Sequence, residues 1–174
     1  IEHLDLIRFG TRTPVVLPAR IYDDPELLET LQTYSQRKKI YVVTQFNHPA
    51  ELTGEAKKAV DALLNAGVVL KNQTVLLKGV NDDGRTMGEL LKGLTRWGIA
   101  PYYIFQCRAV SGVKGQFQVP LAEGCRIVEG AKNMQNGQGK CIRYAMSHVT
   151  GKIEILGPMP DGQMLFKYHQ AKYD

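Results

Sequence analysis

The sequence has few cysteines, and they form no recognisable pattern. Its 174 residues contain three of them, Cys107, Cys125 and Cys141. No two are spaced like the ligands of a zinc or iron–sulfur site, and an odd, scattered set does not make a disulfide framework. A disulfide-stabilised secreted scaffold is therefore excluded. We expect reduced thiols and a cytoplasmic protein, with no metal bound by this chain.

The sequence also lacks long hydrophobic runs. No stretch reaches the roughly 18 apolar residues that a membrane-spanning helix needs, and no signal peptide is recognisable. With 44% hydrophobic and 22% charged residues, the composition is that of an ordinary soluble domain without a membrane partner. The first residue is Ile1, and a strand pattern is already present in residues 1–8. We therefore expect the chain to be a piece of a longer protein.

Several functional motifs are missing as well. There is no Ser-His-Asp or Cys-His arrangement and no glycine-rich phosphate fingerprint, so hydrolytic catalysis has no support. The formal net charge is +5, but its Lys and Arg residues are scattered, and the only tight basic run is Arg37-Lys38-Lys39. Without a recognised module or an aromatic platform, this charge does not predict nucleic-acid binding.

What the sequence does contain is a regular alternation of strands and helices. Strand patterns cover residues 3–10, 39–46, 72–79 and 101–107, and helix patterns cover 23–36, 52–67, 83–98 and 121–133. Four consecutive βα units predict parallel strands with right-handed crossovers. Four parallel strands are too few to close a barrel, so they form an open sheet or belong to a larger barrel. We expect one unit over residues 1–138 and an antiparallel β extension over 139–174, with strands at 141–148, 151–156 and 163–170.

Polar side chains gather where the predicted strands end. In parallel sheets these ends meet at one edge, where ligands bind. Cations and amides there favour a polar, anionic small molecule. The candidates are Arg12, Gln45, Asn47, His48, Gln73 and Arg108. Simpler roles exist for some: Arg12 as a brace for its loop, His48 as a backbone partner, Asn81-Asp82-Asp83-Gly84 as a helix cap, and Arg108 as a solvent-exposed or acid-paired cation.

Three long runs carry a resemblance to a known family. They are HLDLIRFGTRTPVVLPARI, TQFNHPAELTGEAKKAVDALLNAGVVLKNQTVLLKGVND and PYYIFQC, and the likeness covers about residues 1–133. Over that span the chain resembles the lysine 2,3-aminomutase family of radical S-adenosylmethionine enzymes, whereas the tail resembles it only loosely. The resemblance implies a partial (β/α)6 barrel, of which this chain supplies the last four βα units. Both the cluster-binding cysteine loop and the glycine-rich S-adenosylmethionine segment of the family would lie outside it.

The resemblance also implies cofactors. The family uses S-adenosylmethionine with a 4Fe-4S cluster to move an amino group between neighbouring carbons of an amino acid, and holds pyridoxal phosphate on a lysine after the last barrel strand. Lys152, in HVTGKIEILG, is the candidate for that lysine, and Lys140 is the alternative. A third possibility is that Lys152 is an exposed lysine that opens a hairpin strand. Gln73 matches a family glutamine between the two cofactors, Asn47 and His48 match its FNHP segment, and Gln45 stands where the family has histidine.

Arg108 is where the resemblance bears on the substrate. The lysine-specific enzymes carry an aspartate at this position that pairs with the substrate's ammonium group. An arginine would repel that group and attract a carboxylate. We therefore expect the full-length protein to be an aminomutase-like isomerase whose substrate has an acidic side chain. No catalytic residue can be assigned within this piece, and we expect the fragment alone to be inactive. The alternatives are a radical enzyme without pyridoxal phosphate and a non-enzymatic half-barrel that binds a nucleotide or a partner. A homo-oligomer is expected.

Overall fold

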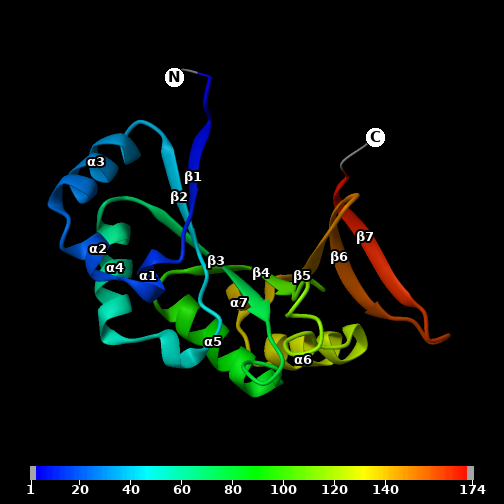
Figure 1. Ribbon diagram of the computed structural model, residues 1–174. Helices are drawn as coiled ribbons and strands as arrows, with labels where there is room; N and C mark the ends of the chain where they lie inside the picture. Colours follow the sequence, from blue (N-terminus) through cyan, green and yellow to red (C-terminus); the bar gives the residue numbers. More distant parts are fainter. Residues whose placement is uncertain (1–2, 172–174) are drawn as a thin grey trace.

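A computed structural model describes residues 3–171. Its centre is one seven-stranded sheet in which the strands lie in sequence order. The first five strands are parallel, and the last two turn antiparallel. Figure 1 shows a curled sheet with helices against its outer face and the β6–β7 hairpin at the end opposite β1. The strands are β1 (Leu6–Gly10), β2 (Lys39–Thr44), β3 (Val69–Leu76), β4 (Ala100–Gln106), β5 (Arg143–His148), β6 (Gly151–Pro158) and β7 (Met164–Ala171).

All four predicted helices are present, and each of the first three begins at an N-cap side chain. Asp24, Thr53 and Asp83 accept hydrogen bonds from Leu27, Ala56 and Thr86 N–H groups at 3.0, 3.1 and 2.8 Å. These bonds satisfy amides that have no partner within a helix. The helices are α1 (Thr13–Val16), α2 (Ala19–Tyr22), α3 (Pro25–Ser35), α4 (Gly54–Asn65), α5 (Gly84–Arg96), α6 (Leu121–Asn133) and α7 (Gly137–Lys140), with a 3₁₀ turn η1 (Pro49–Glu51).

The core lies between the helices and the convex face of the sheet. Along β3, alternate residues are buried, starting with Leu70 and ending with Leu76. They pack with apolar side chains of the helices, such as Leu90 and Leu94 of α5. The intervening residues of each strand face the concave side, because successive side chains of a strand alternate between faces. Within residues 3–171, no helix combines the length and apolar character that crossing a bilayer requires.

One strand differs from the sequence-based expectation. Residues 143–148 were expected to belong to the antiparallel extension, yet β5 pairs in parallel with β4, with Tyr103 opposite Arg143. It pairs antiparallel with β6 on its other side. The reason is that α6 is a crossover, and a crossover returns the chain parallel to the previous strand. The parallel sheet therefore has five strands among the described residues, and only β6 and β7 are antiparallel additions.

Candidate functional site

A polar cavity lies at the carboxyl ends of β1 and β2. Its volume is about 350 Å³. Three of the candidate residues from the sequence line it, Arg12, Gln45 and Gln73. They are separated by up to 61 positions in the chain. The sheet register explains the meeting, because β1 pairs with β2 and β2 with β3. The complete lining is Arg8, Gly10, Thr11, Arg12, Val43, Thr44, Gln45 and Gln73.

Arg12 is partly committed to the protein itself. Its guanidinium forms an ion pair with Glu51, and its Nε donates to the Gln45 carbonyl at 3.2 Å. Arg12 thus braces the loop after β2, and not its own loop before Pro14 as the simpler alternative had it, and it still lines the cavity. Arg8 lines the same cavity, is exposed, and forms no ion pair within the described part of the chain. Compared with Arg12, Arg8 therefore has more of its N–H donors available for an anionic ligand.

Gln73 lies on the concave side of β3. Its neighbours Asn72 and Thr74 are buried on the helix side, whereas Gln73 is half-buried and lines the cavity. Across residues 3–171, its side-chain amide makes no hydrogen bond to another residue. An amide with both its donor and its acceptor unused at a cavity wall is available to a polar ligand.

Asn47 and His48 form hydrogen bonds within the protein, as the simpler alternative for His48 predicted. Neither lines the cavity. The Asn47 side chain is buried, and its Oδ1 accepts from the Val75 N–H at 2.9 Å. The His48 Nδ1 accepts from the Ala50 N–H at 3.1 Å and caps the η1 turn. Both side chains hold the loop after β2 in place, because the turn and the neighbouring strand need partners for their N–H groups.

A buried network that sequence analysis missed also positions the cavity. The Asn72 Oδ1 accepts from the Phe46 N–H at 2.7 Å and from the Thr44 hydroxyl at 2.9 Å. Its Nδ2 donates to Thr74 Oγ1 at 2.8 Å. These bonds tie the end of β2 to β3 on the helix side, and so fix Gln45 and Gln73 on the other side. The available signal was an Asn-x-Thr pair at alternate positions of a strand, on the face that also carries Leu70 and Leu76, since buried polar groups require partners.

Lys152 is half-buried and lies on the concave face. Its Nζ lies 4.5 Å from the centre of the Tyr103 ring and 5.4 Å from that of Phe105. Burial raises the pKa of Tyr103 to about 12, so its hydroxyl stays neutral at ordinary pH. Lys140, the alternative, is an exposed residue at the end of α7. Of the two lysines, only Lys152 lies against other side chains on the concave face.

The concave face is mainly cationic. Strand register places Arg8, Lys71, Arg143 and Lys152 on this side, with Glu154 as a carboxylate among them. The Lys71 ammonium is held between two tyrosine rings, 5.0 Å and 4.8 Å from their centres. A concave surface with clustered charge of one sign attracts ligands of the opposite sign. This face is therefore suited to phosphate or carboxylate groups.

Arg108 follows β4 and lies apart from this cavity. It is exposed, in the loop that leads to α6, and it forms no ion pair within residues 3–171. Its backbone carbonyl accepts from the Val110 N–H at 2.9 Å, which fixes the start of the loop. The alternative of an acid-paired arginine is thus not seen in the described part of the chain, and the guanidinium is solvent-accessible.

The cysteines do not fit an iron–sulfur cluster. Cys107 and Cys125 are buried, and burial raises the pKa of both thiols, whereas Cys141 is exposed. Cluster ligation needs several thiolates close together. In the part of the chain that the structure describes, no three His, Cys, Asp or Glu side chains are grouped to hold a metal ion.

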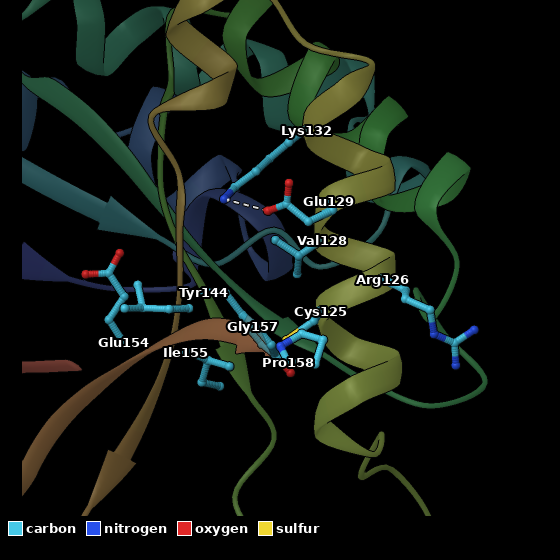
Figure 2. Close-up of a pocket in the computed structure, with 11 residues that line it drawn as sticks. Cys125, Arg126, Val128, Glu129, Lys132, Tyr144, Glu154, Ile155, Gly157 and Pro158 are labelled. Atoms are coloured by element: carbon cyan, nitrogen blue, oxygen red, sulfur yellow. Dashed lines mark hydrogen bonds and ion pairs between the residues drawn. The ribbon is translucent and has the colours of Figure 1, made fainter. Parts of the chain in front are cut away.

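A second cavity, of about 330 Å³, lies on the convex side between α6 and β6. Figure 2 shows Lys132 and Glu129 of α6 paired beside it, at 3.1 Å, while Arg126 points away. Its floor is formed by Cys125, Val128 and Ile155. None of the predicted site residues lines it, whereas three of them line the cavity at β1 and β2.

The arrangement defines a class of protein. A curled, mostly parallel sheet with outer helices and cationic and amide side chains on its concave face is a partial α/β barrel. No protein-family model matches the sequence. Individual proteins do, and they narrow the class.

The similar proteins are aminomutases. The chain is 44% identical over 173 residues to a putative L-lysine 2,3-aminomutase of Aquifex aeolicus, covering 98% of this chain and 46% of that protein. It is 46% identical over 137 residues to L-lysine 2,3-aminomutase of Fusobacterium nucleatum, covering 79% and 31%. Glutamate 2,3-aminomutase of Clostridioides difficile is 42% identical over 137 residues, covering 79% and 31%.

Over most of its length the chain is therefore homologous to part of the lysine 2,3-aminomutases, a family of radical S-adenosylmethionine enzymes, as its sequence motifs predicted. It spans less than half the length of the curated relatives it matches. The Aquifex alignment covers nearly all of this chain, so the antiparallel strands share in that likeness. The tail is thus less divergent from that relative than the sequence motifs alone indicated.

Proposed function

We propose that this chain is part of a radical S-adenosylmethionine aminomutase, an isomerase, and that Lys152 holds its pyridoxal phosphate. The observation that carries the proposal is the position of the Lys152 amine on the concave face, over the rings of Tyr103 and Phe105. A lysine that binds a cofactor must project into the enclosed side of the barrel. Family membership supplies the reaction class, since the similar proteins are named as 2,3-aminomutases.

The residues around Lys152 fit pyridoxal phosphate. Tyr103 and Phe105 offer stacked aromatic faces, with ring centres 5.1 Å apart, against which a pyridine ring can pack. Arg143 and Lys71 supply positive charge on the same face for a phosphate group. When bound, pyridoxal phosphate supplies a π-system that accommodates the radical while the amino group migrates. The protein's own contribution is to attach, orient and enclose that ring.

The cavity at β1 and β2 fits a polar part of S-adenosylmethionine. Arg8 can pair with a carboxylate, and the amides of Gln45 and Gln73 can each donate and accept. Gln45, unlike a histidine, does not titrate near neutrality, so its hydrogen bonds are independent of pH. The described residues provide no ligand set for the 4Fe-4S cluster, so that group would be held by other parts of the enzyme.

We further propose that the substrate has an acidic side chain, held by Arg108. The relatives do not choose between substrates, because lysine and glutamate aminomutases are similar to this chain at 46% and 42% identity. The support is the arginine itself, which is exposed after β4 with its guanidinium uncommitted to any ion pair within residues 3–171. A guanidinium binds a carboxylate through two parallel hydrogen bonds and repels an ammonium group.

Reductive trapping tests the role of Lys152. The protein is incubated with pyridoxal phosphate, reduced with borohydride, and digested for mass spectrometry. We expect a stable pyridoxyl group on Lys152, lost in Lys152→Ala and kept in the control Lys167→Ala, which removes an exposed lysine from β7. Attachment to another lysine, such as Lys140, would reject Lys152 as the site of attachment. No attachment under saturating cofactor would favour a radical enzyme that works without pyridoxal phosphate.

A further inference from the structure

Three side chains from three strands form a hydrogen-bonded chain beside Lys152. Arg143 of β5 contacts His169 Nδ1 at 3.0 Å, and His169 Nε2 of β7 contacts the Tyr103 hydroxyl of β4 at 2.6 Å. His169 is the member contributed by the antiparallel hairpin, and its ring meets the Tyr103 ring edge-on at 5.6 Å. Tyr103 is consequently only 1% exposed, although it lies on the concave face.

The direction of these bonds follows from the chemistry of arginine. A guanidinium can only donate, so His169 Nδ1 must be the acceptor and carries no proton. A neutral imidazole then has its proton on Nε2, which donates to the Tyr103 oxygen. The contact with Arg143 therefore assigns the tautomer of His169. A protonated imidazole would lose the bond to Arg143 and place two cations in contact.

We infer that His169 is a positioning residue for Lys152 and that the β6–β7 hairpin is a working part of the cofactor site. The ring of Tyr103 is the surface over which the Lys152 ammonium lies, at 4.5 Å. His169 contacts an edge of that ring, Phe105 stacks with it at 5.1 Å between centres, and Tyr102 lies beside it at a tilt, 4.1 Å between centres. Through Tyr103, the Arg143–His169 pair determines where the Lys152 amine is held. The assignment of a cofactor to Lys152 rests on the proposed function, but the positioning itself does not.

The first test is spectroscopic and uses the unmodified protein. We expect the ¹⁵N chemical shifts of the His169 ring at neutral pH to show a neutral imidazole protonated on Nε2. A proton on Nδ1, or an imidazolium ion, would overturn the arrangement, because neither can accept a hydrogen bond from Arg143.

The second test measures the reactivity of Lys152 directly. Acetic anhydride labels unprotonated amines, and mass spectrometry compares Lys152 with Lys167 in the same sample. His169→Ala is expected to speed Lys152 labelling about two- to fivefold, the range that loss of one cation–π contact accounts for. His169→Gln retains a donor and an acceptor and should restore the slow rate. Tyr168→Phe, on the same strand, removes only a bond to Thr150 and should not alter it.

An unchanged labelling rate in His169→Ala would overturn the inference, whatever the cofactor does. A rate that responds to His169, in a protein whose Lys152 captures no pyridoxal phosphate, would uphold the positioning role and reject the proposed function. The two failures are therefore distinguishable.

Discussion

At the scale of single residues, the arginines near the strand ends differ in how far their guanidinium groups are already engaged by the protein. Arg12 pairs with Glu51 and donates a hydrogen bond to the loop after β2. Arg108 has no such partner in the described part of the chain and stands after β4. An uncommitted cation needs no internal bond to be broken before it binds a ligand. This difference makes Arg108 the sharper test of substrate preference.

Arg108→Asp is therefore expected to reverse that preference. In the full-length enzyme, assayed anaerobically with reductant, kcat/KM for glutamate should fall about 10- to 100-fold, because a close charge pair becomes a repulsion worth about 1–3 kcal/mol. Activity on lysine should rise relative to glutamate. Lys114→Asp, which makes a similar charge change in the same loop, serves as the control. Turnover of lysine alone by the unmodified enzyme would contradict the proposed role of Arg108.

At the scale of elements, α6 approaches the sheet unusually closely at one glycine. A Cβ on Gly124 would meet the Tyr144 hydroxyl, and it would lie 3.2 Å from Leu76 Cδ2. Tyr144 cannot easily move, because it is buried and donates to Gln106. The contact also fixes α6 beside β5, the strand that carries Arg143.

Gly124→Ala is expected to destabilise the fold by about 1–3 kcal/mol through overpacking, as measured by urea unfolding. Gly130→Ala on the same helix is the matched control. Its nearest neighbour would be Gly84 Cα at 3.6 Å, an ordinary contact, so it should be neutral or stabilise by up to about 1 kcal/mol. Equal unfolding midpoints for the two variants would refute the close approach.

Elements were predictable where local chemistry decides them, and not where distant contacts do. The caps Asp83 and Thr53 are visible in sequence because each acts within three residues. The parallel pairing of β5 was missed because strand direction depends on a crossover. His48 fits the local rule for a turn cap, although the family motif assigned it to a cofactor. The partnership of Tyr103 and His169 spans 66 positions, and neither residue gives a local signal for it.

At the scale of the whole molecule, two buried tyrosine hydroxyls make the stability of the fold depend on pH. Tyr144 of β5 is buried against α6, and burial raises its pKa above the usual value of 10.0. Burial likewise raises the pKa of Tyr103 to about 12. Both hydroxyls remain protonated in the folded protein at pH values where those of the unfolded chain have ionised. Because the unfolded state then binds fewer protons, stability must fall as pH rises.

The free energy of unfolding is thus expected to be unaffected by these two groups below about pH 9 and to decline from about pH 10 upward. Urea unfolding midpoints measured between about pH 8 and pH 11 test this. Tyr144→Phe should lower stability by about 1–3 kcal/mol at pH 8, because Gln106 Oε1 loses its donor, and should flatten the alkaline decline. Tyr34→Phe, at a half-exposed position on α3, should change neither. Lysine ionisation is common to both variants and cancels in the comparison. A full alkaline decline in Tyr144→Phe would mean that the buried Tyr144 hydroxyl is not one of the groups that link folding to pH.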